Sequence, residues 1–284
     1  GSVLIGSKEK IDKALRIRKV LGGGMRQVGY LAACGLYALE NNIERLSLDH
    51  KKAEEIAVRL EQRGHDVEVV NYNGSDEITL AMCKGEAQIG IGQIDAVDAR
   101  RLEGCRLHPT ADYGTELSFL LFPPGTKKRQ RKLHKLDESN FILVDTIGSG
   151  SDLFWRTIVR IENSEDGNGS DWAKVSPVHE MAELATSLAN FGEIDGLLLV
   201  RLPSSPDIIN LLDDGWRLGE LYEKDINDYV FNNASLYEAQ AIKVKGKKTY
   251  GGGSGYKVKS FILTTADIKS DRTLFTDIVR SSKF

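Results

Sequence analysis

The sequence predicts an α/β protein whose sheet is covered by helices on both faces. Three features predict it: apolar strand-like runs, turns of glycine and serine directly after them, and apolar residues at helical spacing after the turns. The clearest case is Phe141 to Trp155, which reads FILVDTIGSGSDLFW. Strands that are apolar throughout belong to sheets buried on both sides, so we expect two covering layers of helices.

The length and composition of the chain are those of an ordinary globular protein. With 284 residues it can form one large or two modest domains, and a formal net charge of −3 does not indicate a nucleic-acid partner. The apolar runs are far shorter than the roughly 18 residues that a membrane span needs, and no secretory signal is recognisable at the start. Cys34, Cys83 and Cys105 are far apart and form no CxxC pair, so neither a disulfide framework nor a zinc site is expected.

Residues 1–62 are predicted to be a helical segment. Apolar residues recur at helical spacing from Ser7 to about Leu60. The three glycines at 22–24 interrupt this pattern, because glycine is too costly in entropy for the interior of a helix. The expected order is therefore a helix, a glycine elbow, a long helix, a short turn and a further helix.

Beyond residue 63 the spacing changes to that of buried strands. Val67–Val70 and Ile89–Ile91 are predicted strands, joined by a helix that begins near Gly74. The same unit recurs at residues 141–161 and, less clearly, at 181–200. The run GGGSG at 251–255 has the composition of a flexible linker or a hairpin tip.

Polar turns follow the predicted strands and form the candidate site. In a parallel sheet such turns meet at the carboxyl edge, where ligands bind, and the N-terminus of a helix offers backbone N–H groups to an anion. The loop at 148–151 lacks the lysine of a Walker motif, which favours a carboxylate over a phosphate. Each residue could instead be a helix cap or an internal hydrogen-bond partner. The predicted ligand-binding residues are Gly74, Ser75, Gln93, Asp95, Gly148, Ser149, Gly150, Ser151 and Arg201.

No catalytic, metal or cofactor site is predicted. The five histidines are scattered, and neither HExxH nor GxSxG occurs. The residues therefore predict a binding protein that is not an enzyme and uses no cofactor.

From Val67 onward, over about three quarters of the chain, the sequence resembles the solute-binding receptors of TRAP transporters, of the type called TAXI. The resemblance implies the type II periplasmic-binding fold, in which two lobes close on a small organic acid or amino acid. It also implies membrane transporter subunits as partners and a periplasmic or cell-envelope location, with the cytoplasm as the alternative. Its ligand contacts would fall on the turns at Gly74, Ser75, Gln93, Asp95 and 148–151. The segments that carry it are NGSDEITLAMCKGEAQIGIGQIDAV (73–97), YGTELSFLLFPPGT (113–126), FILVDTIGSGSD (141–152), GEIDGLLLV (192–200) and YKVKSFILTTADI (256–268).

The first sixty residues resemble another family, the low-specificity L-threonine aldolases, which use pyridoxal phosphate. RKVLGGGMRQ, at 18–27, carries this resemblance most specifically. In that family the Schiff-base lysine lies a few residues before the GSV segment, so here it is expected before Gly1. Arg26 matches the family's arginine near the cofactor phosphate. The alternative function is therefore an aldolase-related protein, expected to be inactive without that lysine.

The two resemblances together predict a composite chain. Residues 1–62 are the helical aldolase-like segment, 63–107 and 218–284 form lobe one, and 108–217 form lobe two. The first strand of lobe one is missing or replaced. Val3–Ser7 could serve as that strand, or it could be left over from the aldolase, with the binding lobe incomplete. The junction could also be an artificial or erroneous fusion.

Overall fold

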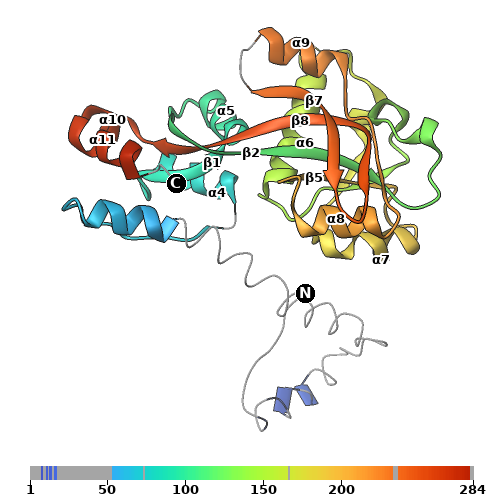
Figure 1. Ribbon diagram of the computed structural model, residues 1–284, viewed down its shortest axis with the longest axis horizontal. Helices are drawn as coiled ribbons and strands as arrows, with labels where there is room; N and C mark the ends of the chain where they lie inside the picture. The colour runs from blue at the N-terminus through green and yellow to red at the C-terminus, as the bar shows by residue number, and fades with distance from the viewer. Residues whose placement is uncertain are drawn as a thin grey trace. The chain divides into compact units, whose positions relative to one another are not determined.

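The protein is described from a computed structural model (Figure 1). It describes residues 53–72, 74–165, 167–232 and 236–281, together with helical residues Lys8, Ile11, Lys13, Ala14, Arg16 and Ile17. The chain divides into two compact units, Gly1–Lys52 and Ala53–Phe284. The predicted glycine elbow and long helix, Arg26 and Val3–Ser7 lie outside the described residues.

The unit Ala53–Phe284 is built on one mixed sheet that runs through two lobes. The strand order is β1-β8-β2-β5-β3-β4, with β6 beside β2 and β7 beside β8. Two long antiparallel strands, β2 (His108–Phe122) and β8 (Thr249–Thr264), pass from one lobe into the other (Figure 1). The prediction of a two-lobed α/β fold is confirmed.

Lobe one packs helices on both faces of its short sheet. Neighbouring residues of a strand point to opposite faces, and β8 uses this: Ile262 lies in a core with Ile56 and Leu60, whereas Leu263 lies in another with Met82 and Val97. Residues 53–61 are helical. The other elements are α4 (Ser75–Lys84), β1 (Ile89–Gln93), α5 (Ile94–Leu102), α10 (Ala266–Ser270) and α11 (Arg272–Ser281).

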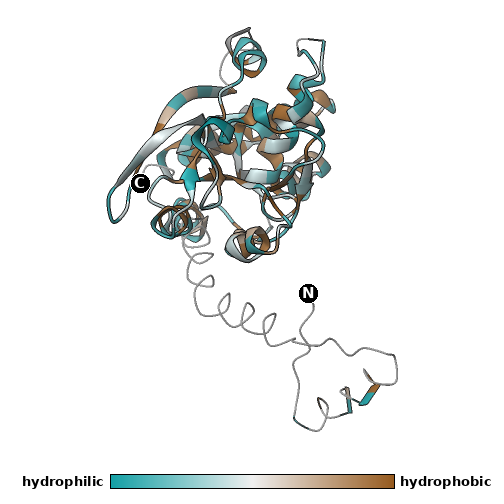
Figure 2. Cartoon of the chain, turned by 90° about the vertical axis from the view of Figure 1, so that its right-hand side faces the viewer, coloured by the Kyte–Doolittle hydropathy of each residue, from teal (hydrophilic) through white to brown (hydrophobic). Residues whose placement is uncertain are grey.

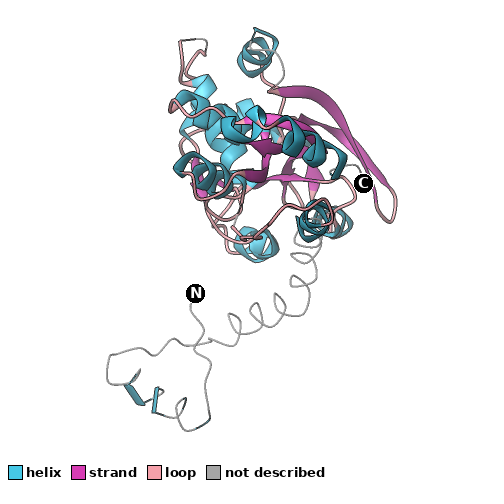
Figure 3. Ribbon diagram, turned by 90° about the vertical axis from the view of Figure 1, so that its left-hand side faces the viewer, coloured by secondary structure: helices cyan, strands magenta, loops and turns pink. Residues whose placement is uncertain are grey.

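Lobe two has three layers, a sheet with helices on each of its two faces. In β5 (Gly196–Arg201), Leu198 and Val200 contribute to the core under α6 (Gly150–Glu162), whereas Leu197 and Leu199 contribute to the core under α7 (Ala185–Asn190) and α8 (Pro206–Asp213). Helices therefore cover the sheet on both faces, as predicted from its apolar strands (Figures 2 and 3). The remaining elements are η1 (Lys128–Gln130), η2 (Leu133–Lys135), β3 (Phe141–Leu143), η3 (Asp171–Lys174), β4 (Ser176–Val178), η4 (Ala182–Leu184), β6 (Arg217–Leu218), α9 (Lys224–Asn232) and β7 (Tyr237–Lys245). α9 and β7 fall within 218–284, the range expected in lobe one, but Ile226 and Tyr237 pack in the core under α6, so the two elements are described with lobe two (Figure 1).

The predicted strand at Val67–Val70 is wrong. These residues form no strand, and the side chains of Val69 and Val70 are 40% and 53% exposed. Val67 packs beside Ile89 and Ile91 without strand pairing, so β1 is the last strand of the sheet. A strand needs a hydrogen-bonded neighbour, and among the described residues β1 pairs only with β8.

The prediction that GGGSG is a linker or hairpin tip is also wrong. These residues lie inside β8 and pair with β7. The physical reason is close backbone packing, because an added Cβ at Gly255 would lie 2.0 Å from the carbonyl oxygen of Ser118. At Gly253 it would lie 2.7 Å from that of Gly219. At positions 253 and 255, therefore, glycine is needed for space rather than for flexibility.

Cys83 and Cys105 form a disulfide, which the sequence did not predict. Cys83 lies near the end of α4 and Cys105 follows α5, so the chain between them returns through β1 and α5. Their Cα atoms lie 5.9 Å apart although 22 positions separate them in sequence. The long spacing hid a pair that the fold brings together.

Candidate functional site

The N-terminus of α6 is the centre of the candidate site. Ser149 caps the helix, since its hydroxyl accepts from the backbone N–H of Asp152 at 3.2 Å. Gly148 has a positive φ of 81° and donates its N–H to the carboxylate of Asp152 at 2.9 Å. The N–H groups of Gly150 and Ser151 have no hydrogen-bond partner among the described residues, as expected for the first turn of a helix. They are the donors that an anion would use.

Turns from lobe one lie directly against this helix start. An added Cβ at Gly74 would lie 2.4 Å from the carbonyl oxygen of Gly148, and one at Gly150 would lie 2.3 Å from the side-chain amide of Gln93. At Gly74 the close atom belongs to the backbone, so only glycine allows this approach, whereas a side chain at position 150 would displace Gln93. The structure therefore brings together the turns at Gly74, Gln93 and 148–151, which are far apart in sequence.

Gln93 is the most informative side chain of this contact. It is 5% exposed, its backbone N–H donates to the hydroxyl of Ser75 at 3.2 Å, and its Nε2 donates to Glu116 at 2.8 Å. Its Oε1 is buried and accepts no hydrogen bond within the described ranges. Leaving a buried acceptor unpaired costs about 1–3 kcal/mol. We therefore expect a hydrogen-bond donor to contact Gln93 Oε1 in the functional state of the protein.

Arg201 is held by the protein itself. Its guanidinium forms ion pairs with Asp145 and Asp207 and donates to the carbonyl oxygen of Val200 at 2.9 Å. Burial alone would lower the pKa of Arg201, but the charges of Asp145 and Asp207 raise it overall. The arginine therefore stays charged and braces the turns after β3 and β5. Sequence reasoning missed Asp145, which has a positive φ of 67°; its place directly after a strand was the available signal.

Asp95 is held by internal partners. Its side chain is fully buried and accepts from the backbone N–H of Ala96 at 3.0 Å and from the hydroxyl of Tyr237 at 2.8 Å. Burial raises the pKa of Asp95 to about 7. A buried carboxyl with two internal partners is placed to link elements of the fold rather than to touch a ligand directly.

Two serines of the helix start are expected to differ in their effect on stability. Ser151 is fully buried, and its hydroxyl accepts from the backbone N–H of Val200 at 3.0 Å. Ser151→Ala leaves that N–H unpaired and should cost about 1–3 kcal/mol of unfolding free energy. Ser149→Ala removes only a cap and should cost about 1 kcal/mol. Urea denaturation of both variants checks this, and wild-type stability of Ser151→Ala would contradict it.

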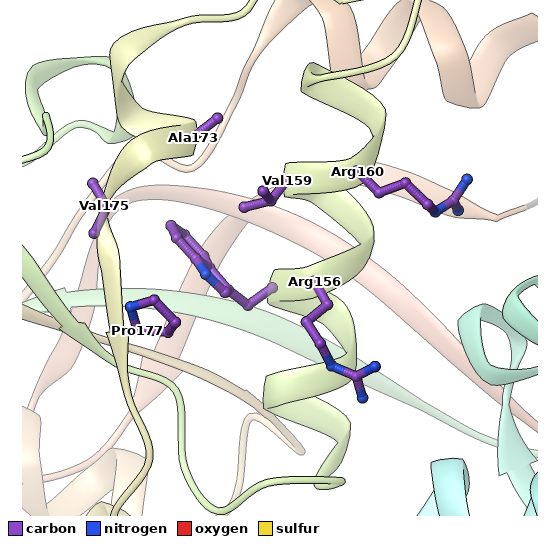
Figure 4. A pocket seen from close by; sticks show the side chains of 7 residues that line it. Arg156, Val159, Arg160, Ala173, Val175 and Pro177 are labelled. Carbon is purple, nitrogen blue, oxygen red and sulfur yellow. The ribbon is translucent and has the colours of Figure 1, made fainter.

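A separate hollow lies on the outer side of α6 in lobe two (Figure 4). It has a volume of about 350 Å³ and a largely apolar lining. The guanidinium groups of Arg156 and Arg160 point away from it, toward ion pairs with Asp76 and Asp98 at 2.8 and 2.9 Å (Figure 4). The lining residues are Trp155, Arg156, Val159, Arg160, Ala173, Val175 and Pro177.

Two other kinds of feature are absent from the described part of the chain. Within the described ranges, no group of three or more histidine, cysteine, aspartate or glutamate residues could hold a metal ion. In the same residues, no helix is both long and apolar enough to cross a membrane.

Known proteins resemble different parts of the chain. Residues 1–80 match the family described as beta-eliminating lyase. The low specificity L-threonine aldolase of Escherichia coli strain K12 is 52% identical over 67 residues, which is 24% of this chain and 20% of that protein. Low-specificity L-threonine aldolase 1 of Arabidopsis thaliana is 53% identical over 62 residues, covering 22% of this chain and 17% of that protein. The chain thus spans about a fifth of the length of these curated relatives.

Solved structures align with most of the chain at low identity. The GluR0 ligand-binding core in complex with L-glutamate covers 81% of this chain and 80% of its own, with 13% identity and a TM-score of 0.48. The amino acid ABC transporter substrate-binding protein AbpA from Streptococcus pneumoniae, bound to L-arginine, covers 82% of this chain and 75% of its own. That pair has 12% identity and a TM-score of 0.47.

The prediction that the protein is not an enzyme is corrected by the first of these matches. Residues 1–80 match an enzyme family, and about half of the aligned residues are identical to threonine aldolases. The predicted resemblance of the first sixty residues to these aldolases is confirmed. Residues 18–27, which carry it most specifically, lie outside the described part of the chain.

Proposed function

We propose that the two-lobed unit is a receptor that captures a small carboxylate-bearing ligand between its lobes. The observation that carries the proposal is the unpartnered, buried Oε1 of Gln93, which lies against the N-terminus of α6. An unpaired acceptor beside unpaired N–H donors is the complement of a ligand that has both a carboxylate and a donor group.

The arrangement favours an amino acid or a hydroxylated organic acid. The N–H groups of Gly150 and Ser151 would donate to the ligand carboxylate, with support from the helix dipole. Gln93 Oε1 would accept from an ammonium or hydroxyl group of the same ligand. The nearby arginines Arg156 and Arg201 are already paired with aspartates, so a second carboxylate would meet no uncommitted guanidinium from either of them.

Capture requires the lobes to separate and close again. The contacts at Gly74 and Gln93 leave no room for a side chain, so a ligand would enter only when these turns move away from α6. The lobes are joined through β2 and β8, and hinge motion about crossing segments is a common mode of ligand closure. Ion pairs between Asp76 and Arg156 and between Asp98 and Arg160 would form on closing.

We propose that the receptor delivers its captured ligand to a membrane transporter. The proposed partner is a transporter of the TRAP type. The compartment proposed is the periplasm or cell envelope, with the cytoplasm as the alternative. The Cys83–Cys105 disulfide supports the envelope, because disulfides persist in oxidising compartments.

Ligand-induced stabilisation tests the receptor function. Amino acids, hydroxy acids and dicarboxylates at millimolar concentration are compared by thermal shift, and binders are then measured by calorimetry. At least one amino or hydroxy acid should raise Tm, since a ligand that binds only the folded state stabilises it. Gln93→Leu should weaken that ligand at least about tenfold, the loss of one hydrogen bond of about 1.4 kcal/mol.

The matched control is Gln130→Leu, an exposed glutamine of η1 that should bind as the wild type does. The proposal fails if no acid stabilises chain shown to be folded. It also fails if Gln93→Leu binds the ligand with unchanged affinity.

A second candidate function belongs to the N-terminal residues: a pyridoxal-phosphate lyase or threonine aldolase activity of the protein. The match of residues 1–80 favours it. Incubation with pyridoxal phosphate, borohydride reduction and mass spectrometry would reveal a modified lysine if the cofactor forms a Schiff base here. Absence of any modified lysine would count against this candidate for the chain as it stands.

A further inference from the structure

The carboxyl group of Asp95 bridges the two lobes at a point closed to solvent. Asp95 is the second residue of α5 in lobe one, and its side chain is fully buried. Its Oδ2 accepts from the hydroxyl of Tyr237 at 2.8 Å. Tyr237 begins β7, and its ring lies 4.8 Å from that of Phe154, centroid to centroid, inside the core of lobe two. Separation of the lobes would therefore break this bond and expose Asp95 to water.

No cation neutralises this carboxylate within the described residues. Ala96 and Tyr237 supply neutral hydrogen bonds, and the charge of Glu116, on β2, acts against ionisation. Arg160, on α6, forms an ion pair with Asp98, and its positive charge acts to lower the pKa of Tyr237. A buried carboxylate without a paired cation is costly, so the neutral acid is the form that closure favours.

We propose that closure of the lobes takes up one proton from solvent at Asp95, so that Asp95 and Tyr237 form a proton-linked latch. The proposal deepens the receptor function above and rests on it only for the purpose of closure. In the latched state the proton would lie on Oδ2 and be donated to the oxygen of Tyr237. The tyrosine hydroxyl also has a side-chain hydrogen bond with Thr157. Each closure of the lobes would thus bind one proton from solvent, and each opening would release it.

The direction of the pH dependence follows from the two states of Asp95. In the closed state burial raises its pKa to about 7, whereas an exposed aspartate has the ordinary value of 3.8. The ratio of closed to open molecules should be highest below pH 3.8 and fall about tenfold per pH unit up to about 7. Above that it should stay level. Burial raises the pKa of Tyr237, and the charge of Asp95 and the shared hydrogen bond raise it further, so the tyrosine stays protonated throughout.

A ligand-free measurement of lobe separation tests the latch. Fluorophores are attached through non-canonical amino acids at Glu103 in lobe one and Phe191 in lobe two, which leaves the Cys83–Cys105 disulfide intact. Their wild-type residues are exposed. Energy transfer is followed from pH 4 to 9, with circular dichroism to show that the chain stays folded. We expect transfer in the wild type to fall as pH rises toward 7.

Three variants separate the latch from general effects of charge. Asp95→Asn has no titrating proton and should give a flat profile over this range. Tyr237→Phe keeps the ring but removes the hydroxyl and should lower transfer in the acidic arm of the titration. Asp98→Asn removes a neighbouring ion pair between the lobes, so it should lower transfer at every pH without shifting the midpoint.

Two results would overturn the latch: a flat wild-type profile, or an Asp95→Asn profile that matches the wild type. Because no ligand is added, the latch and the receptor function fail separately. A pH-dependent closure in a chain that binds no acid refutes only the receptor. Acid binding with pH-independent closure refutes only the latch.

Discussion

Replacement of Phe154 by alanine is expected to lower the free energy of unfolding by about 3–5 kcal/mol. Phe154 is completely buried on α6, and its ring lies 4.8 Å from that of Tyr237 and 6.2 Å from that of Tyr256. The substitution removes apolar contacts from three elements and leaves a cavity that tightly packed neighbours cannot fill. Urea denaturation followed by tryptophan fluorescence measures the loss.

The control for Phe154→Ala is Phe191→Ala. Phe191 follows α7 and is 82% exposed, so its loss should change stability by no more than about 0.5 kcal/mol. Equal losses in the two variants would contradict the packing described for lobe two.

Removal of the Cys83–Cys105 disulfide is expected to cost about 3 kcal/mol, because the bond closes a loop of 22 positions in the unfolded chain. Guanidinium denaturation of the double variant Cys83→Ala, Cys105→Ala measures the cost. The effect should fall on lobe one, where the bond joins the end of α4 to the segment after α5.

The reductant dithiothreitol gives an independent control. It should destabilise the wild type by a similar amount and leave the double variant unchanged. A wild type that is equally stable with and without reductant would show that the bond contributes nothing to the folded state.

The parts of the fold that the sequence predicted are those decided by neighbouring residues. The run from Phe141 to Ser151 forms β3, a turn and a capped helix, because apolar runs, glycines and a serine cap act within a few residues of each other. The strand β5 is equally local, and it lies beside β3 in parallel.

The features that the sequence did not predict depend on distant partners. Val67–Val70 has the composition of a strand, yet pairing requires a neighbour that the described residues do not provide. The glycines of β8 look flexible until Ser118 and Gly219 are seen to pack against them. Most strand pairs are antiparallel, so a common carboxyl edge holds only for β3, β4 and β5.

The candidate site shows the same division. The turns at Gly74, Gln93 and 148–151 were predicted one by one, because each follows or precedes a regular element, and the structure brings them into contact. Glu116 and Tyr237 could not be predicted as site residues from the sequence. Each lies within a strand, and no turn or motif beside it marks a site. Arg201 and Asp95 were predicted as ligand contacts, but their internal partners became visible only in three dimensions.

Helix α6 takes part in three different kinds of contact. Its N-terminus carries the candidate site, one side carries Phe154 and Ile158 into the core, and Arg156 and Arg160 reach across to lobe one. Nine of its thirteen residues are buried. A substitution within α6 is therefore expected to change folding stability together with the geometry of the candidate site.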